Sequence, residues 1–86
     1  MARIGVVGAG AWGTTLGDML ARKGHDVSLW ALEPEVVCRI NAGRENTTYL
    51  PGVPLDERVV ATGSLAQAVR DAEFAGRGGR RRQTRL

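Results

Sequence analysis

A glycine-rich segment near the amino terminus constrains the fold of this 86-residue chain more than any other feature. Residues 8–13 read GAGAWG, a GxGxxG pattern, and follow the apolar, β-branched segment RIGVV at residues 3–7, which predicts a buried strand. Beyond the glycines, an amphipathic helix is predicted over residues 11–23. Its apolar side chains recur at helical spacing and are expected to face the core: Leu16, Met19 and Leu20.

A GxGxxG pattern in a strand-to-helix turn is typical of sites that bind the pyrophosphate of a dinucleotide. Gly8 permits a tight turn, Gly10 lets the backbone approach the pyrophosphate, and Gly13 lets the helix pack close to the strand. The helix start offers N–H groups and a partial positive charge to the phosphates. The alternative is a glycine-rich turn that binds nothing.

The remainder of the chain alternates strands and helices. Strands are predicted over residues 26–31 and 58–61, and helices over residues 34–42 and 65–72. The intervening residues 43–57 contain too many prolines and glycines for a regular element and are expected to form a long ordered loop. The order β-α-β-α-β-α predicts an α/β fold, a partial Rossmann-type parallel sheet with right-handed crossovers.

A fourth strand would come next in this pattern. Glu73 and Phe74 could begin it, but no apolar run follows from Ala75 onward. The sheet is therefore expected to be truncated before the fourth strand, with a bare edge in its place. We expect a partial dinucleotide-binding domain over residues 1–74 and a disordered tail, rich in arginine and glycine, over residues 75–86.

The ribose of the adenosine half should meet the chain just after the second strand. Glu33 could accept hydrogen bonds from its hydroxyl groups, which favours NAD. A 2′-phosphate would favour an arginine, and Leu32 supplies none. NAD is therefore the expected cofactor, with NADP as the alternative. Glu33 could instead be a solvated residue at the start of the second helix, where its negative charge suits the helix dipole.

Three segments together resemble a known family. GAGAWGTTL, ARKGHDVSLW and ENTTYLPGVPL are similar to the amino-terminal part of bacterial NAD(P)-dependent glycerol-3-phosphate dehydrogenase, over roughly residues 2–74. The resemblance implies reversible hydride transfer between sn-glycerol 3-phosphate and dihydroxyacetone phosphate, which serves glycerophospholipid synthesis. It also implies a homo-oligomer for the complete enzyme.

The resemblance assigns roles to individual positions. It places Ala11 and Trp12 against the cofactor, Leu32 and Glu33 towards the adenosine ribose, and Tyr49 in a loop that borders the cofactor. The family often has arginine where this chain has Leu32, which argues against a preference for NADP. The catalytic lysine of the family lies beyond residue 86, so no catalytic residue is carried over and a fragment without turnover is expected.

Charge and cysteine content address partners and compartment. Residues 1–74 carry a net charge of −2, whereas the last twelve residues carry five arginines and no acid. Cys38 is the only cysteine, which excludes an internal disulfide and fits a reducing cytoplasm. Glycines interrupt the amino-terminal apolar run and oppose a signal peptide, and no segment approaches the length of a membrane span, so no membrane partner is expected.

Two hypotheses address the arginine-rich tail. A one-base shift of reading frame in a GC-rich gene would convert most of the glycine and arginine codons into codons for valine, alanine, glycine, aspartate or glutamate. A strand of valine and alanine could thus lie in the other frame, so the tail is expected to derive from a frameshift or truncation. The alternative is a small Rossmann-like binding module whose basic tail binds nucleic acid. Under the first hypothesis, binding to nucleic acid is not expected.

Overall fold

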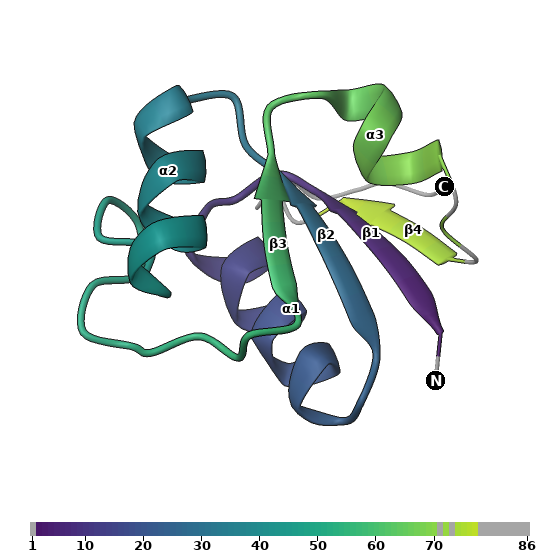
Figure 1. Ribbon diagram of the computed structural model, residues 1–86, viewed down its shortest axis with the longest axis horizontal. Coiled ribbons are helices and arrows are strands. Elements are labelled where there is room, and N and C mark those ends of the chain that lie inside the picture. Colours follow the sequence, from purple (N-terminus) through teal and green to yellow (C-terminus); the bar gives the residue numbers. More distant parts are fainter. Residues whose placement is uncertain (1, 71, 73, 78–86) are drawn as a thin grey trace.

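The computed structural model describes residues 2–70, 72 and 74–77 (Figure 1). Strands and helices alternate along the chain. They are β1 (Arg3–Val7), α1 (Ala11–Arg22), β2 (Asp26–Trp30), α2 (Pro34–Gly43), β3 (Val59–Thr62), α3 (Leu65–Arg70) and β4 (Phe74–Arg77). All four strands are parallel, in the order β3-β2-β1-β4. The predicted α/β Rossmann-like fold is confirmed, and the predicted elements agree with these bounds to within two residues.

The expectation that the sheet ends before a fourth strand is wrong. β4 pairs in parallel with β1, from Ile4 opposite Phe74 to Val7 opposite Arg77, so it extends past residue 74. Parallel pairing uses backbone N–H and C=O groups, which any residue except proline supplies in full, and β1 offers a complete row of them. An apolar run is therefore not required for this strand. Residues 78–86 of the expected tail lie outside the described residues.

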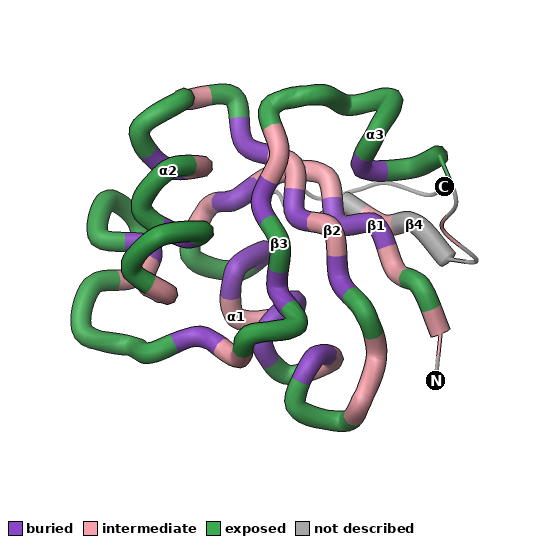
Figure 2. The backbone as a smooth tube through the Cα atoms, in the orientation of Figure 1, coloured by how far each residue is buried: buried purple, intermediate pink, exposed green. Residues whose placement is uncertain are grey.

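The two faces of the sheet are covered to different extents. α1 and α2 lie on the face that carries Val6, Leu29 and Val59, and these side chains are buried (Figures 1 and 2). α3 packs on the opposite face over β1, and Val60 on that face remains about half exposed. Strands β2 and β3 therefore alternate between buried and more exposed positions instead of being buried throughout.

α1 buries only part of the side that was expected. Leu20 is partly buried and packs against the core, Leu16 is partly buried, and Met19 is 50% exposed. The buried positions are small or polar: Gly13, Thr14, Gly17, Asp18 and Ala21. The reason is the close approach of α1 to the sheet, since a Cβ atom added at Gly17 would lie 3.3 Å from Cγ1 of Val27. Large side chains do not fit between helix and sheet at this separation.

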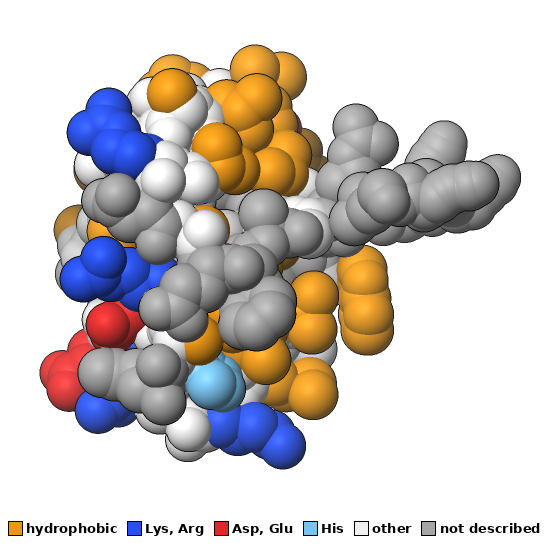
Figure 3. All heavy atoms as spheres, turned by 90° about the vertical axis from the view of Figure 1, so that its right-hand side faces the viewer, with side chains coloured by type: hydrophobic (Ala, Val, Ile, Leu, Met, Phe, Trp, Pro, Cys, Tyr) orange, Lys and Arg blue, Asp and Glu red, His pale blue; other side chains and the backbone are white. Residues whose placement is uncertain are grey.

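Exposed apolar side chains remain on the surface. Seen from the side of β4, they gather mainly on one half of the surface, and charged side chains gather mainly on the other (Figure 3). The large exposed apolar residues are Trp12, Met19, Leu32, Tyr49, Val53, Val60, Leu65 and Val69. Among the described residues, no helix is long and apolar enough to cross a membrane.

The loop between α2 and β3 is irregular, as expected, and polar contacts hold it at the sheet. Arg44 ends α2 in the left-handed conformation, with φ of 56°, and its guanidinium donates to the carbonyl of Val59. Asn41 of α2 covers the free edge of β3, because its amide donates to the Ala61 carbonyl at 2.9 Å and accepts from the Ala61 N–H at 2.8 Å. This pairing satisfies backbone groups that an edge strand leaves open.

Gly5 of β1 lies against the backbone of α3. A Cβ atom at this position would lie 2.4 Å from the backbone carbonyl oxygen of Ala68, which cannot move unless α3 moves. We predict that Gly5→Ala lowers the free energy of unfolding by about 1–3 kcal/mol, measured by urea denaturation and circular dichroism. Gly43→Ala is the control, because a Cβ atom there meets no described atom within 4 Å and alanine favours a helix. Equal stability of the two variants would contradict the prediction.

Candidate functional site

The glycine turn lies at the carboxyl end of β1, where ligands bind in open α/β sheets. Gly8 has φ of 114°, a conformation that favours glycine, and its N–H donates to the Trp30 carbonyl at the end of β2, with an N···O distance of 3.0 Å. The tight turn predicted at Gly8 is therefore present. It joins the ends of two neighbouring strands.

α1 begins immediately after the turn. Gly10 is its N-cap residue, and its carbonyl accepts the Thr14 N–H at 2.9 Å. No side chain caps the helix start, and the first turn of α1 contains no acidic residue. The first N–H groups of the helix and the positive end of its dipole are thus left available to an anion.

Gly10 is not required by the fold. Its φ of −70° and ψ of −174° are extended backbone that any residue adopts. Within the described part of the chain, a Cβ atom added at Gly10 would meet no heavy atom within 4 Å. The missing side chain leaves open space directly in front of the helix start.

The side chain of Asn46 fastens the loop to this turn. It is fully buried, and its amide nitrogen donates to the Ala9 carbonyl and to the Thr14 hydroxyl, both at 2.8 Å. Its amide oxygen accepts the N–H of Tyr49 at 3.0 Å. Asn46 is not among the residues expected at the site from the sequence, although it lies within the segment ENTTYLPGVPL. An asparagine in a loop rich in proline and glycine was the available signal, because such side chains often bond to turn backbone.

Glu33 and Tyr49, sixteen residues apart, are in direct contact. The Tyr49 hydroxyl donates to Oε2 of Glu33. This hydrogen bond raises the pKa of the Tyr49 phenol above its ordinary value, and the negative charges of Glu33 and, to a smaller degree, Glu35 act in the same direction. A residue expected near the adenosine ribose and one expected in a loop that borders the cofactor are thus brought together.

The other expected cofactor residues lie around the same end of the sheet. Ala11 and Trp12 are in the first turn of α1, and the side chain of Trp12 is 56% exposed. Leu32 precedes α2 and is 75% exposed. Gly13 is buried in α1. No hydrogen bond between described residues joins Trp12 or Leu32 to Glu33 or Tyr49, so the structure brings only the last two together.

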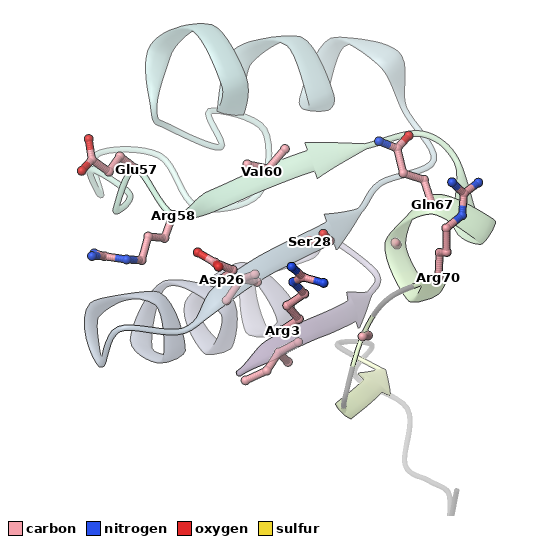
Figure 4. Close-up of a pocket in the computed structure, with 12 residues that line it drawn as sticks. Arg3, Asp26, Ser28, Glu57, Arg58, Val60, Gln67 and Arg70 are labelled. Carbon is pink, nitrogen blue, oxygen red and sulfur yellow. The ribbon is translucent and has the colours of Figure 1, made fainter. Parts of the chain in front are cut away.

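A hollow of about 550 Å³ lies elsewhere, on the face of the sheet that α3 partly covers (Figure 4). Arg3, Asp26 and Arg58 line it from the amino-terminal ends of the strands, and Gln67 and Arg70 line it from α3. The glycine turn follows the opposite ends of the strands. This hollow is therefore separate from the candidate site.

The parallel order β3-β2-β1-β4 and the glycine turn between β1 and α1 define the class of protein. The chain contains the first mononucleotide-binding half of a dinucleotide-binding α/β domain. Comparisons with known proteins agree with this class. Residues 3–75 match the family model described as the amino terminus of NAD-dependent glycerol-3-phosphate dehydrogenase.

Curated relatives carry the same name. The chain is 56% identical over 68 residues to glycerol-3-phosphate dehydrogenase (NAD(P)+) from Citrifermentans bemidjiense, covering 79% of this chain and 20% of the relative. It is 57% identical over 72 residues to the enzyme of that name from Hyphomonas neptunium, covering 83% of this chain and 21% of the relative. The chain thus spans about a fifth of the length of the curated relatives it matches.

Solved structures give the same result. Glycerol-3-phosphate dehydrogenase from Coxiella burnetii has a TM-score of 0.81 at 36% identity, over 88% of this chain and 23% of that one. The enzyme from Plasmodium falciparum has a TM-score of 0.77 at 32% identity, over 88% of this chain and 24% of that one. The chain belongs to the NAD-dependent glycerol-3-phosphate dehydrogenase family, as the sequence motifs indicated, and matches its NAD-binding amino-terminal part.

Asn46 provides a test of how the loop is held to the turn. Asn46→Ala leaves the Tyr49 N–H without its acceptor and the Ala9 carbonyl without its amide donor, in a buried place. We predict a loss of about 2–3 kcal/mol in the free energy of unfolding, measured by urea denaturation. Asn41→Ala also removes two hydrogen bonds to backbone, but Asn41 is exposed and these bonds are only partly buried, so water can reach the freed groups and the loss should be about 1 kcal/mol. A larger loss for Asn41→Ala would contradict this assignment.

Proposed function

We propose that this chain binds NAD at the carboxyl ends of β1 and β2, as the cofactor-binding part of a glycerol-3-phosphate dehydrogenase. The observation that carries the proposal is the open space at Gly10, where neither backbone conformation nor packing of the described residues calls for glycine. A pyrophosphate close to the backbone accounts for the missing side chain. The uncapped start of α1, with no acid in its first turn, supplies N–H donors and positive potential at the same place.

The remaining residues take the roles that the sequence suggested. In this proposal, Gly8 shapes the turn and the buried Gly13 lets α1 pack close to the strand. Ala11 and Trp12 contact the cofactor from the helix start. Leu32 and Glu33 face the adenosine ribose, and Tyr49 lies in the loop that borders the cofactor. When bound, NAD supplies the hydride acceptor or donor of the reaction.

We propose for the whole enzyme the reversible hydride transfer between sn-glycerol 3-phosphate and dihydroxyacetone phosphate, in the cytoplasm and in a homo-oligomer. The names of the relatives support the reaction, and the lone Cys38 fits the compartment. Exposed apolar side chains such as Met19, Val60 and Val69 support packing against other parts of such an enzyme. Groups that hold the substrate against the nicotinamide, including the catalytic lysine, are assigned by resemblance to those other parts.

Gly10→Ser separates cofactor binding from folding. Serine is a favourable N-cap residue, so the free energy of unfolding should stay the same or rise by a few tenths of a kcal/mol. The added side chain occupies the open space and takes up N–H groups of α1, so NAD affinity should fall at least tenfold in isothermal titration calorimetry. Gly43→Ser, at the end of α2, should leave NAD affinity unchanged. Undiminished NAD binding by Gly10→Ser would refute the assigned phosphate site.

A further inference from the structure

The contact between Tyr49 and Glu33 is the last step of a chain of hydrogen bonds that begins at the glycine turn. The Ala9 carbonyl accepts from the amide of buried Asn46, Asn46 accepts from the backbone of Tyr49, and the Tyr49 hydroxyl donates to Glu33. The distances for the first two bonds are 2.8 and 3.0 Å. The position of the Glu33 carboxylate is thus tied to the turn proposed to hold the pyrophosphate.

This connection lowers the entropic cost of presenting Glu33 to a ligand. A glutamate side chain has several freely rotating bonds, and fixing it in one conformation costs about 1–2 kcal/mol. Its backbone is already held, because the Glu33 carbonyl accepts the N–H groups of Val36 and Val37. Tyr49 fixes the side chain as well, through Oε2. Among the described residues, no hydrogen bond engages Oε1, which leaves this oxygen able to accept from a ligand hydroxyl.

The charges around the pair determine which ligand fits. Glu33 and Glu35 both stand close enough to Tyr49 to raise its pKa. Leu32, the neighbouring residue, is exposed and carries no charge. Two carboxylates attract hydroxyl donors, whereas they repel a phosphate group, which carries between one and two negative charges at neutral pH.

We propose that Tyr49 is a positioning residue that holds the Glu33 carboxylate towards the adenosine ribose, and that this pair makes the site prefer a dinucleotide with a free 2′-hydroxyl over one with a 2′-phosphate. The inference rests on the proposed function, since it concerns the same cofactor site. Its new content is the dependence of cofactor choice on Tyr49, which lies in a different loop from the residue that contacts the ribose.

The pairing itself can be measured without any cofactor. Tyr49 is the only tyrosine of the chain, so ultraviolet absorbance during alkaline titration reports its ionisation directly. The wild-type phenol should titrate above the ordinary tyrosine pKa of about 10. Glu33→Gln should bring the pKa back towards that value, because it removes the negative charge at the hydroxyl, and Glu35→Gln should lower it less. An identical titration curve for wild type and Glu33→Gln would overturn the proposal.

Cofactor preference is measured by titrating the 86-residue chain and its variants with NAD and with NADP. Wild type should bind NAD at least tenfold more tightly than NADP. Glu33→Gln should abolish most of this difference, and Tyr49→Phe should reduce it about three- to fivefold, mainly through weaker NAD binding. Tyr49→Phe in the Glu33→Gln background should change the ratio no further, since a positioning residue acts only through the group it positions.

Thr48→Val serves as the matched control. Thr48 is an exposed neighbour of Tyr49, and its hydroxyl forms no hydrogen bond to a described residue, so its loss should leave the affinity ratio unchanged. Circular dichroism verifies that each variant is folded. A purely structural role for Tyr49 would weaken both cofactors equally and leave the ratio intact.

The outcomes distinguish the inference from the proposed function. Wild-type chain that binds neither dinucleotide would overturn the proposed function, and the inference with it. Binding of NAD with an unchanged ratio in Tyr49→Phe and Glu33→Gln, or a wild-type preference for NADP, would overturn the inference and leave the proposed function standing.

Discussion

The buried amide of Asn46 is the interaction on which the arrangement of the candidate site depends. It connects the loop at Tyr49 to two neighbouring segments more than thirty residues earlier in the sequence, the glycine turn at Ala9 and helix α1 at Thr14. Because the side chain is fully buried, water cannot replace a broken hydrogen bond there, and each unpaired group would cost about 1–3 kcal/mol. These hydrogen bonds therefore hold the loop against the turn.

The other end of the loop is fixed by a second polar cluster. Asp18, buried in α1, accepts the Asp56 N–H at 2.8 Å and pairs with Arg22 at 2.9 Å. Arg22 in turn donates to the Pro54 carbonyl, and the adjacent carboxylate of Asp18 raises the Arg22 pKa. Apolar Leu55 is buried between these contacts. The loop has no regular structure, but hydrogen bonds join both of its ends to α1 or to the glycine turn. Tyr49 is therefore held in one position.

Local patterns in the sequence predicted most helices and strands. The buried face of α1, strand β4 and the contact between Glu33 and Tyr49 depend on tertiary contacts, which those patterns do not contain. The spacing of hydrophobic residues and the positions of glycines located three strands, three helices and the turn at Gly8, since these depend on neighbouring residues. The buried face of α1 could not be found in this way, because the close approach at Gly17 excludes large side chains such as Met19. β4 was missed because its pairing with β1 uses backbone groups that carry no hydrophobic signal. The contact between Glu33 and Tyr49 depends on the path of a whole loop.

The glycines of this chain show that a glycine motif indicates a ligand site only when the structure gives no other reason for the glycine. At Gly5 the fold itself excludes a side chain, since the Ala68 carbonyl occupies the position of the Cβ atom. At Gly8 the reason is the backbone, because φ is positive. Neither reason applies at Gly10, where the described residues leave the space open. Open space alone does not indicate a ligand, since Gly43 has it as well, but at Gly10 the space lies at the uncapped positive end of α1, where an anionic cofactor is bound most favourably.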